Sequence, residues 1–312
     1  MTGFDTVIVV DWSAGKRAHR PRADAIWIGM SRDGHNADPR FCPDRLTAEA
    51  EIAALLDAEI AAGRRVLASF DFPFGYPQGF AEAVTGTADP FAMWDWLDAR
   101  ITDTPDGSNN RFDVAAEINR LFDGPGPFWG KPNKTGWPDI PYRKSGIRFD
   151  RVPEKRACDV AAKAASSCFQ LFYPPTVGGQ ILTGLPVLAR LRRRFAGRLA
   201  VWPFEPWDSA PVVFAEIWPG LIQPAVDDAM AAHAEAGEDR PIKDREQVRL
   251  LAQALAVLPD AELDGMMTDP TEAARREEAW ILGTGHAERL CGRARMAIVR
   301  PGGSDGRGAM AH

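Results

Sequence analysis

Two apolar runs that each end at an aspartate constrain the fold of this chain more than any other feature. Residues 7–10 read Val-Ile-Val-Val and precede Asp11, and residues 66–70 read Val-Leu-Ala-Ser-Phe and precede Asp71. Such runs are typical of central strands that are buried on both faces. A carboxylate at the end of a buried strand is unfavourable unless it is paired, hydrogen-bonded or bound to a metal. We therefore expect an α/β sheet with a functional site at the ends of these two strands.

The segments between the two runs predict a β-β-β-α-β order. A strand is expected over 25–30, a hairpin turn over 31–34 and a short third strand over 40–42. A helix capped by Thr47 follows, with apolar residues at helical spacing as far as Gly63. In open α/β sheets, ligands bind at the carboxyl ends of the parallel strands. The two aspartates lie at such ends.

The second half of the chain predicts one more buried strand and several helices. The strand is expected over 211–217, with the carboxylate of Glu216 inside it. Helices are expected over 113–122, 157–171 and 188–198, directly after Asp244, and between Pro270 and Gly283. The whole pattern predicts an α/β fold with a mixed sheet flanked by helices.

The chain of 312 residues is expected to form one domain over residues 1–290, followed by a flexible tail over 291–312. Between about residues 76 and 155 the sequence is irregular and rich in proline, glycine and tryptophan. Segments of this length without regular elements are usually functional when they occur inside a domain. This segment is therefore predicted to be an inserted lid.

Composition and spacing exclude several classes of protein. The net charge of −6 does not provide the basic surface that tight binding to duplex nucleic acid requires. No stretch approaches the roughly 18 apolar residues of a membrane span, and the N-terminus does not read as a signal peptide. We therefore expect a cytoplasmic protein with no membrane partner. The four cysteines have neither disulfide nor zinc spacing, so reduced thiols are expected.

Dispersed carboxylates predict a site for Mg²⁺ or Mn²⁺. Asp11, Asp71 and Glu216 lie in or directly after apolar β runs, and Glu277 or Glu278 lies in the expected late helix. Hard divalent cations prefer oxygen ligands, and in phosphoryl transfer they activate water and stabilise the leaving oxygen. The simpler alternative is that the aspartates cap turns and the glutamates are solvated. We take the three strand carboxylates as the candidate catalytic residues.

Several charged residues are candidate contacts to a substrate phosphate. The segment 131–163 has nine Lys or Arg against four Asp or Glu, which suggests a basic rim for an anionic ligand. Arg156 and Asp159 are three residues apart at an expected helix start, where they share a face and an anion is favoured. An ordinary ion pair between them is the alternative. The full set of candidates is Lys16, Lys131, Arg148, Arg156 and Asp159.

Four short segments carry a resemblance to a known family. They are residues 9–13 (VVDWS), 69–75 (SFDFPFG), 156–159 (RACD) and 215–219 (AEIWP), and residues 177–186 and 201–205 resemble the middle section of the same family. Their order and spacing resemble a bacterial domain-of-unknown-function family described as predicted ribonuclease-H-like nucleases. The resemblance implies a ribonuclease-H-like fold, in agreement with the β-β-β-α-β order expected from the residues. It also implies a metal-dependent hydrolase of phosphodiester or other phosphorylated substrates.

The resemblance leaves two other functions open. An actin-like phosphotransferase would use the first-strand acid and the turn after it to bind a nucleotide, and a non-catalytic binding module would retain only the fold. Ribonuclease-H-like enzymes commonly bring one acid from a late helix to the metal, and the resemblance around Glu278 favours it over Glu277. Asp159 is the alternative fourth ligand. The expected partner is nucleic acid or a small phosphorylated substrate.

Overall fold

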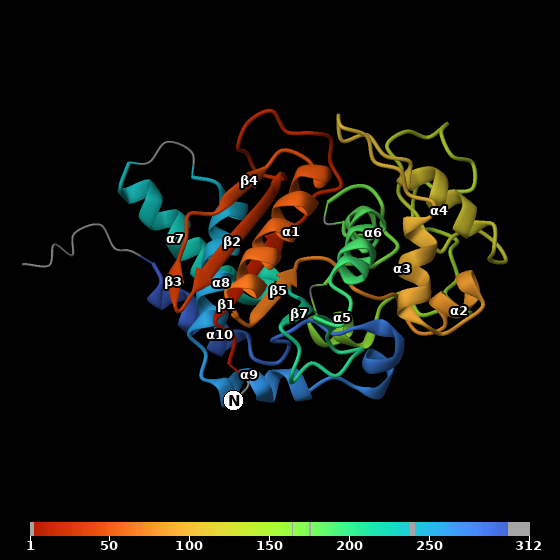
Figure 1. Cartoon of the computed structure of the whole chain (residues 1–312). Helices are drawn as coiled ribbons and strands as arrows, with labels where there is room; N and C mark the ends of the chain where they lie inside the picture. The colour runs from red at the N-terminus through yellow and green to blue at the C-terminus, as the bar shows by residue number, and fades with distance from the viewer. Residues whose placement is uncertain (1–2, 164, 175, 238–240, 299–312) are drawn as a thin grey trace, which may run out of the picture.

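A seven-stranded mixed sheet forms the centre of the protein, with helices on both faces (Figure 1). The computed structural model describes residues 3–163, 165–174, 176–237 and 241–298. The strands are β1 (Thr6–Asp11), β2 (Ile26–Arg32), β3 (His35–Asn36), β4 (Arg40–Cys42), β5 (Val66–Phe70), β6 (Leu199–Val201) and β7 (Val212–Glu216). Their order across the sheet is β3-β2-β1-β5-β7-β6, and β4 also pairs with β2.

The pairing of the strands places three of their ends at one edge of the sheet. Strand β1 is antiparallel to β2 and parallel to β5, and β5 in turn is parallel to β7. The expected strand and helix order of the first seventy residues is confirmed, with β3 as an additional two-residue strand. Because β1, β5 and β7 are parallel, Asp11, Asp71 and Glu216 all lie at the same edge.

Helices cover both faces of the sheet because successive strand residues point to opposite sides. Ile8 and Val10 pack in a core with α1 (Arg45–Ala61) and α6 (Gly178–Arg194). Val7 and Val9 pack on the other side, in a core formed with α7 (Gln223–Glu235), α8 (Lys243–Ala256) and α10 (Ala287–Met296). The short helices α9 (Asp260–Thr268) and η1 (Pro219–Ile222) complete this second layer. Within the described ranges, no helix is long and apolar enough to cross a membrane.

The segment expected to be an inserted lid packs into the core of the domain. It contains α2 (Phe80–Thr85), α3 (Pro90–Asp98) and α4 (Arg111–Asn119), which gather at one end of the molecule (Figure 1). Trp94 and Phe128 are fully buried in the same core as α1 and α6. The aromatic residues of this segment therefore stabilise the fold.

Two expected helices are much shorter in the structure. Helix α5 spans only Ala157–Ala161, and the chain leaves the helical conformation at Lys163, whose φ is 58°. The late helix is a single π-helical turn, η2 (Ala274–Glu278), and Ala279 after it has a φ of 64°. A residue with positive φ does not continue a right-handed helix, which explains both early ends.

Helix α1 begins earlier than expected, and the C-terminal part is more ordered. The N-cap of α1 is Asp44, whose side chain accepts a hydrogen bond from the amide of Thr47. The expectation of a tail from residue 291 is corrected, because Cys291 and Ala294 of α10 are buried. The remainder of the expected tail, residues 299–312, lies outside the described residues.

Candidate functional site

Asp11 and Asp71 lie side by side where two neighbouring parallel strands end. Val10 of β1 pairs with Phe70 of β5, so the aspartate that follows each of them occupies the same register position. The amide of Trp12 donates a 2.7 Å hydrogen bond to Asp71 Oδ1. The ends of the two strands therefore hold the two carboxyl groups together on one side of the sheet.

The environment of this pair disfavours two negative charges. Burial raises the pKa of Asp11 well above its ordinary value, and repulsion from Asp71 raises it further. Burial also raises the pKa of Asp71, although hydrogen bonds from the Asp11 carboxyl and from the Trp12 amide oppose that rise. Burial and mutual repulsion thus act against two ionised carboxylates side by side at this position. Titratable groups with such shifts are concentrated at functional sites.

A cavity of about 530 Å³ opens beside Asp11, and its size suits a small-molecule ligand. Its acidic wall also includes Asp24 and Asp244, and the Asp24 amide donates a 2.7 Å hydrogen bond to Asp244 Oδ2. Asp24 has a φ of 57°, a strained conformation of the kind found at functional sites. Burial raises the pKa of Asp244. Together with Asp71, four carboxyl groups therefore lie in and next to this cavity.

The lining of this cavity also contains an arginine, a helix start and aromatic residues. Arg111 comes from the start of α4, and Gly179 and Gln180 come from the first turn of α6. Gln180 Nε2 donates a 2.6 Å hydrogen bond to the carbonyl of Trp12, which joins the start of α6 to the loop after β1. Tyr173, with a φ of 70°, contributes a partly exposed ring. The cavity is therefore lined by acidic, cationic and apolar groups together.

A second cavity, of about 410 Å³, adjoins the first and contains most of the other candidates. Asp24 lines both cavities, and Asp71, Arg156, Asp159 and Glu216 line the second one. The structure thus brings five of the candidate residues, Asp11, Asp71, Arg156, Asp159 and Glu216, to one end of the sheet.

All five N–H groups of the Arg156 guanidinium are used inside the protein. They donate to both carboxylate oxygens of Asp159, at 3.1 and 2.8 Å, and to both oxygens of Glu216, at 2.6 and 2.7 Å. The fifth donates to the carbonyl of Glu278 at 3.0 Å. Arg156 is fully buried, so no N–H remains for a substrate phosphate. The expected phosphate-binding role of Arg156 and Asp159 is corrected to a structural one.

The pleat of the sheet separates Glu216 from the aspartate pair. Glu216 pairs with Phe70, one residue before Asp71, so its side chain leaves the sheet on the opposite face. Burial raises the pKa of Glu216, and the charge of Arg156 opposes the rise. Among the residues that the structure describes, no group of three or more His, Cys, Asp or Glu side chains is arranged to hold a metal. The expected three-carboxylate cluster is therefore corrected to a pair, Asp11 and Asp71.

The two late glutamates bind backbone amides of the chain itself. Glu278 accepts hydrogen bonds from the amides of Gln78 and Ala157, at 3.0 and 2.9 Å, and Glu277 accepts from the amides of Gly79 and Ala81. Both side chains are buried, and neither lines the two cavities. The expectation that Glu278, or Glu277, completes a metal site is corrected: the two residues fix the start of α2 and the start of α5.

The three basic candidates lie elsewhere. Lys131 is buried, and its ammonium donates to the carbonyls of Gly136 and Trp137, at 2.6 and 2.8 Å. Arg148 is 83% exposed at its side chain and pairs with Asp150. Lys16 is exposed in the loop after β1. None of the three lines either cavity, so their expected contacts to substrate are not formed at this site.

Sequence reasoning missed three residues of the first cavity: Asp24, Asp244 and Arg111. Asp24 follows a polar loop, and Asp244 is in the first turn of α8, where acidic residues are common for local reasons. Arg111 lies in a segment without clear periodicity. No local signal distinguishes these three from ordinary surface residues, because only the tertiary fold brings them beside Asp11.

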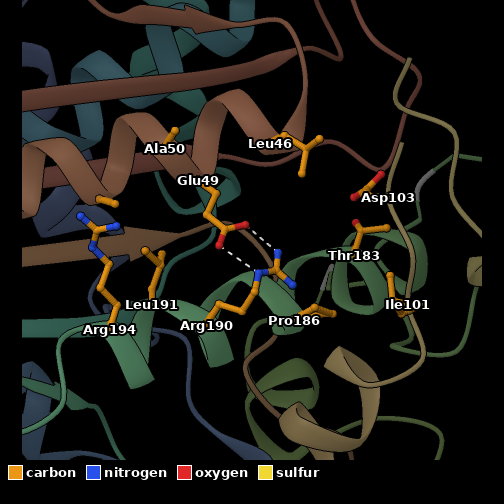
Figure 2. A pocket seen from close by; sticks show the side chains of 11 residues that line it. Leu46, Glu49, Ala50, Ile101, Asp103, Thr183, Pro186, Arg190, Leu191 and Arg194 are labelled. Atoms are coloured by element: carbon orange, nitrogen blue, oxygen red, sulfur yellow. Dashed lines mark hydrogen bonds and ion pairs between the residues drawn. The ribbon is translucent and has the colours of Figure 1, made fainter. Parts of the chain in front are cut away.

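A separate cavity of about 510 Å³ lies between α1 and α6 (Figure 2). Figure 2 shows Glu49 of α1 and Arg190 of α6 facing one another across it, joined by two hydrogen bonds. The other charged residues of its lining, Asp103 and Arg194, also pair with residues of the chain. Because its charges are neutralised internally, this cavity is a weaker candidate than the one beside Asp11.

No family model, curated protein or solved structure matches this chain. The function of this site is therefore inferred from its geometry and from the order of the strands.

Proposed function

We propose that the protein is a divalent-metal-dependent hydrolase of phosphate esters with a ribonuclease-H-like fold. The observation that carries this proposal is the Asp11–Asp71 pair at the ends of two adjacent parallel strands, beside a cavity of about 530 Å³. The strand order supports the fold assignment: β1, β2 and β4 are consecutively antiparallel, and β5 follows α1 and lies parallel to β1. Ligands of such sheets bind at the carboxyl ends of the parallel strands.

The chemistry of the two carboxyl groups fits a hard divalent cation. Mg²⁺ typically binds through one or two protein carboxylates and completes its coordination with waters and substrate phosphate oxygens. Asp11 and Asp71 would hold the cation, and its positive charge would offset the repulsion between the two carboxylates. When bound, the cation supplies charge neutralisation of the phosphate and a more acidic water.

The remaining residues of this end of the sheet position the pair. The Trp12 amide orients Asp71, and Gln180 holds the carbonyl of Trp12. Glu216 Oε2 accepts a 3.1 Å hydrogen bond from the Phe74 amide, which anchors the loop that carries Asp71. We infer that the Arg156–Glu216 ion pair acts on the reaction through this loop, without contact to the substrate.

Hydrolysis assays test the proposal directly. The protein is incubated with Mg²⁺ or Mn²⁺ and, separately, a phosphomonoester, a phosphodiester and a short single-stranded oligonucleotide. We expect metal-dependent hydrolysis of at least one substrate, and a loss of about a hundredfold or more in Asp11→Asn and Asp71→Asn. Mn²⁺ should also raise the melting temperature of the wild type and not of Asp11→Asn, since a ligand of the native state alone stabilises it.

The matched control is Asp33→Asn, an identical change in an exposed turn. Asp33 has a φ of 50°, which asparagine also tolerates, so this variant should keep both activity and the response to Mn²⁺. Absence of hydrolysis together with absence of cation-induced stabilisation would overturn the proposal. Transfer of phosphate from ATP without hydrolysis of the three esters would favour the phosphotransferase instead.

A further inference from the structure

Arg111 is a cation without a carboxylate partner at the edge of the first cavity. Its Nη1 donates a 2.8 Å hydrogen bond to the side-chain oxygen of Asn109, and its buried Nε has no hydrogen-bond partner. Burial and, to a smaller extent, the charge of Arg45 lower the pKa of Arg111 to about 10 against the opposing charge of Asp103. A partly buried charge in this position is unfavourable until an anion binds to it.

The arginines that are fully buried among the described residues have carboxylate partners. Arg45 pairs with Asp103, and Arg156 pairs with Asp159 and Glu216. In the described part of the chain, no carboxylate lies at ion-pair distance from Arg111, and Asp103 is already engaged by Arg45. The chain therefore supplies anions to its other buried guanidinium groups and leaves that of Arg111 open to the cavity.

The first turn of α6 brings further donors to the same cavity. The amides of Gly179 and Gln180 have no hydrogen-bond partner among the described residues, and both residues line the cavity. A Cβ at position 179 would lie 3.2 Å from Arg111 Nε and 3.2 Å from the Cβ of Ala14. Glycine at position 179 therefore allows the Arg111 guanidinium to lie against the first turn of α6. The unpaired N–H groups at the start of a helix favour the binding of an anion.

We propose that Arg111, with the first-turn amides of Gly179 and Gln180, binds the phosphate group of the substrate in the cavity that Asp11 also lines. This inference rests on the proposed function and narrows its substrate to a small phosphate ester with one phosphate in the cavity. The other lining charges are one exposed arginine, Arg22, and three carboxylates, Asp11, Asp24 and Asp244. With only two arginines against three carboxylates in its lining, the cavity suits a single phosphate group and disfavours a long polyanion such as a nucleic-acid strand.

Binding of inorganic phosphate tests this subsite apart from catalysis. Isothermal titration calorimetry at pH 7.5, with and without Mg²⁺, compares the wild type with Arg111→Gln, Arg111→Lys and Gly179→Ala. We expect the wild type to bind phosphate, Arg111→Gln and Gly179→Ala to bind it about tenfold more weakly or worse, and Arg111→Lys to fall between. The matched control is Arg120→Gln, at the other end of α4, where an exposed ion pair with Asp139 is lost and phosphate affinity should not change.

The same measurement separates this inference from the proposed function. Asp11→Asn should still bind phosphate in the absence of metal, even though it loses hydrolysis. If no substrate is hydrolysed but phosphate binds in an Arg111-dependent way, the proposed reaction fails and the subsite stands. Circular dichroism of each variant confirms its fold, and Gly179→Ala tests the subsite with Arg111 still present. Wild-type affinity in both Arg111→Gln and Gly179→Ala, or no phosphate binding by the wild type under either condition, would overturn the subsite.

Discussion

At the scale of single residues, the Asp11–Asp71 pair links the stability of the cation-free protein to pH. Burial and repulsion raise the pKa of Asp11 above the value of about 3.9 for an unfolded aspartate. Between these two values the folded state keeps a proton that the unfolded state has released. The free energy of unfolding therefore falls as the pH rises from about 4 through the raised pKa.

We predict that Asp11→Asn removes most of this pH dependence. Without the Asp11 charge, the repulsion that opposes folding at neutral and alkaline pH is absent, so the variant should be more stable than the wild type there. Urea unfolding in EDTA, at intervals between pH 5 and pH 9, measures the difference. Asp33→Asn should retain the slope of the wild type. A slope in Asp11→Asn equal to that of the wild type would show that the pair does not titrate in this range.

Single residues also show where sequence reasoning reached its limit. Asp11 and Asp71 were predictable because a carboxylate directly after a buried apolar run is unfavourable unless a partner or a bound cation compensates its charge. The partners of Lys131 were not, since two backbone carbonyls five and six residues away hold its ammonium through the loop conformation alone. Arg111 was missed because the sequence alone does not show whether a carboxylate lies next to it in the folded chain.

At the scale of elements, the early strands and α1 were predictable and the strand register was not. The apolar runs identify β1 and β5, and the periodicity after Thr47 identifies α1. Whether Glu216 joins the aspartates depends on its pairing with Phe70, and a shift of one residue would turn its side chain to the other face. No local pattern determines the pairing of strands that lie so far apart in the chain.

Glu59 stabilises the contact between α1 and the sheet. Its carboxylate is fully buried and accepts hydrogen bonds from Arg32 of β2, Arg64 and Thr6 of β1. Burial favours its neutral form, but these hydrogen bonds prevail and lower the pKa of Glu59 to about 2. The stabilisation is therefore complete above the unfolded pKa of about 4.3 and is lost as the pH falls towards 2.

We predict that Glu59→Gln lowers the free energy of unfolding by about 2 kcal/mol at pH 7, the range for hydrogen bonds to a charged group. The difference from the wild type should shrink as the pH falls below about 4.3, because the unfolded wild-type carboxylate then binds a proton that the folded one does not. Urea unfolding at pH 7, 4 and 3 measures this difference. Glu51→Gln, on the same helix and with a 43% exposed side chain, should change stability by less than about 0.5 kcal/mol. A loss in Glu59→Gln that did not depend on pH would contradict this account.

At the scale of the whole molecule, the Arg156 network joins segments that are far apart in the sequence. The guanidinium connects α5 to Glu216 at the end of β7 and to the carbonyl of Glu278 in η2. The Glu278 carboxylate then binds the amides of Gln78 and Ala157. The end of the sheet that carries the aspartate pair is thus assembled around a buried ion cluster.

We predict that Arg156→Lys destabilises the whole fold and leaves the Asp11–Asp71 pair able to bind a cation. Lysine keeps the charge but has three donors in place of five and cannot hold Asp159 and Glu216 bidentately. The loss should be about 3 kcal/mol, as for breaking a buried ion pair, measured by urea unfolding. Mn²⁺ should still raise the melting temperature of the variant, as in the wild type, and the exposed Arg148→Lys should match the wild type in both measurements. Wild-type stability of Arg156→Lys would contradict this account, because it would mean that the bidentate contacts to Asp159 and Glu216 do not hold this end of the sheet together.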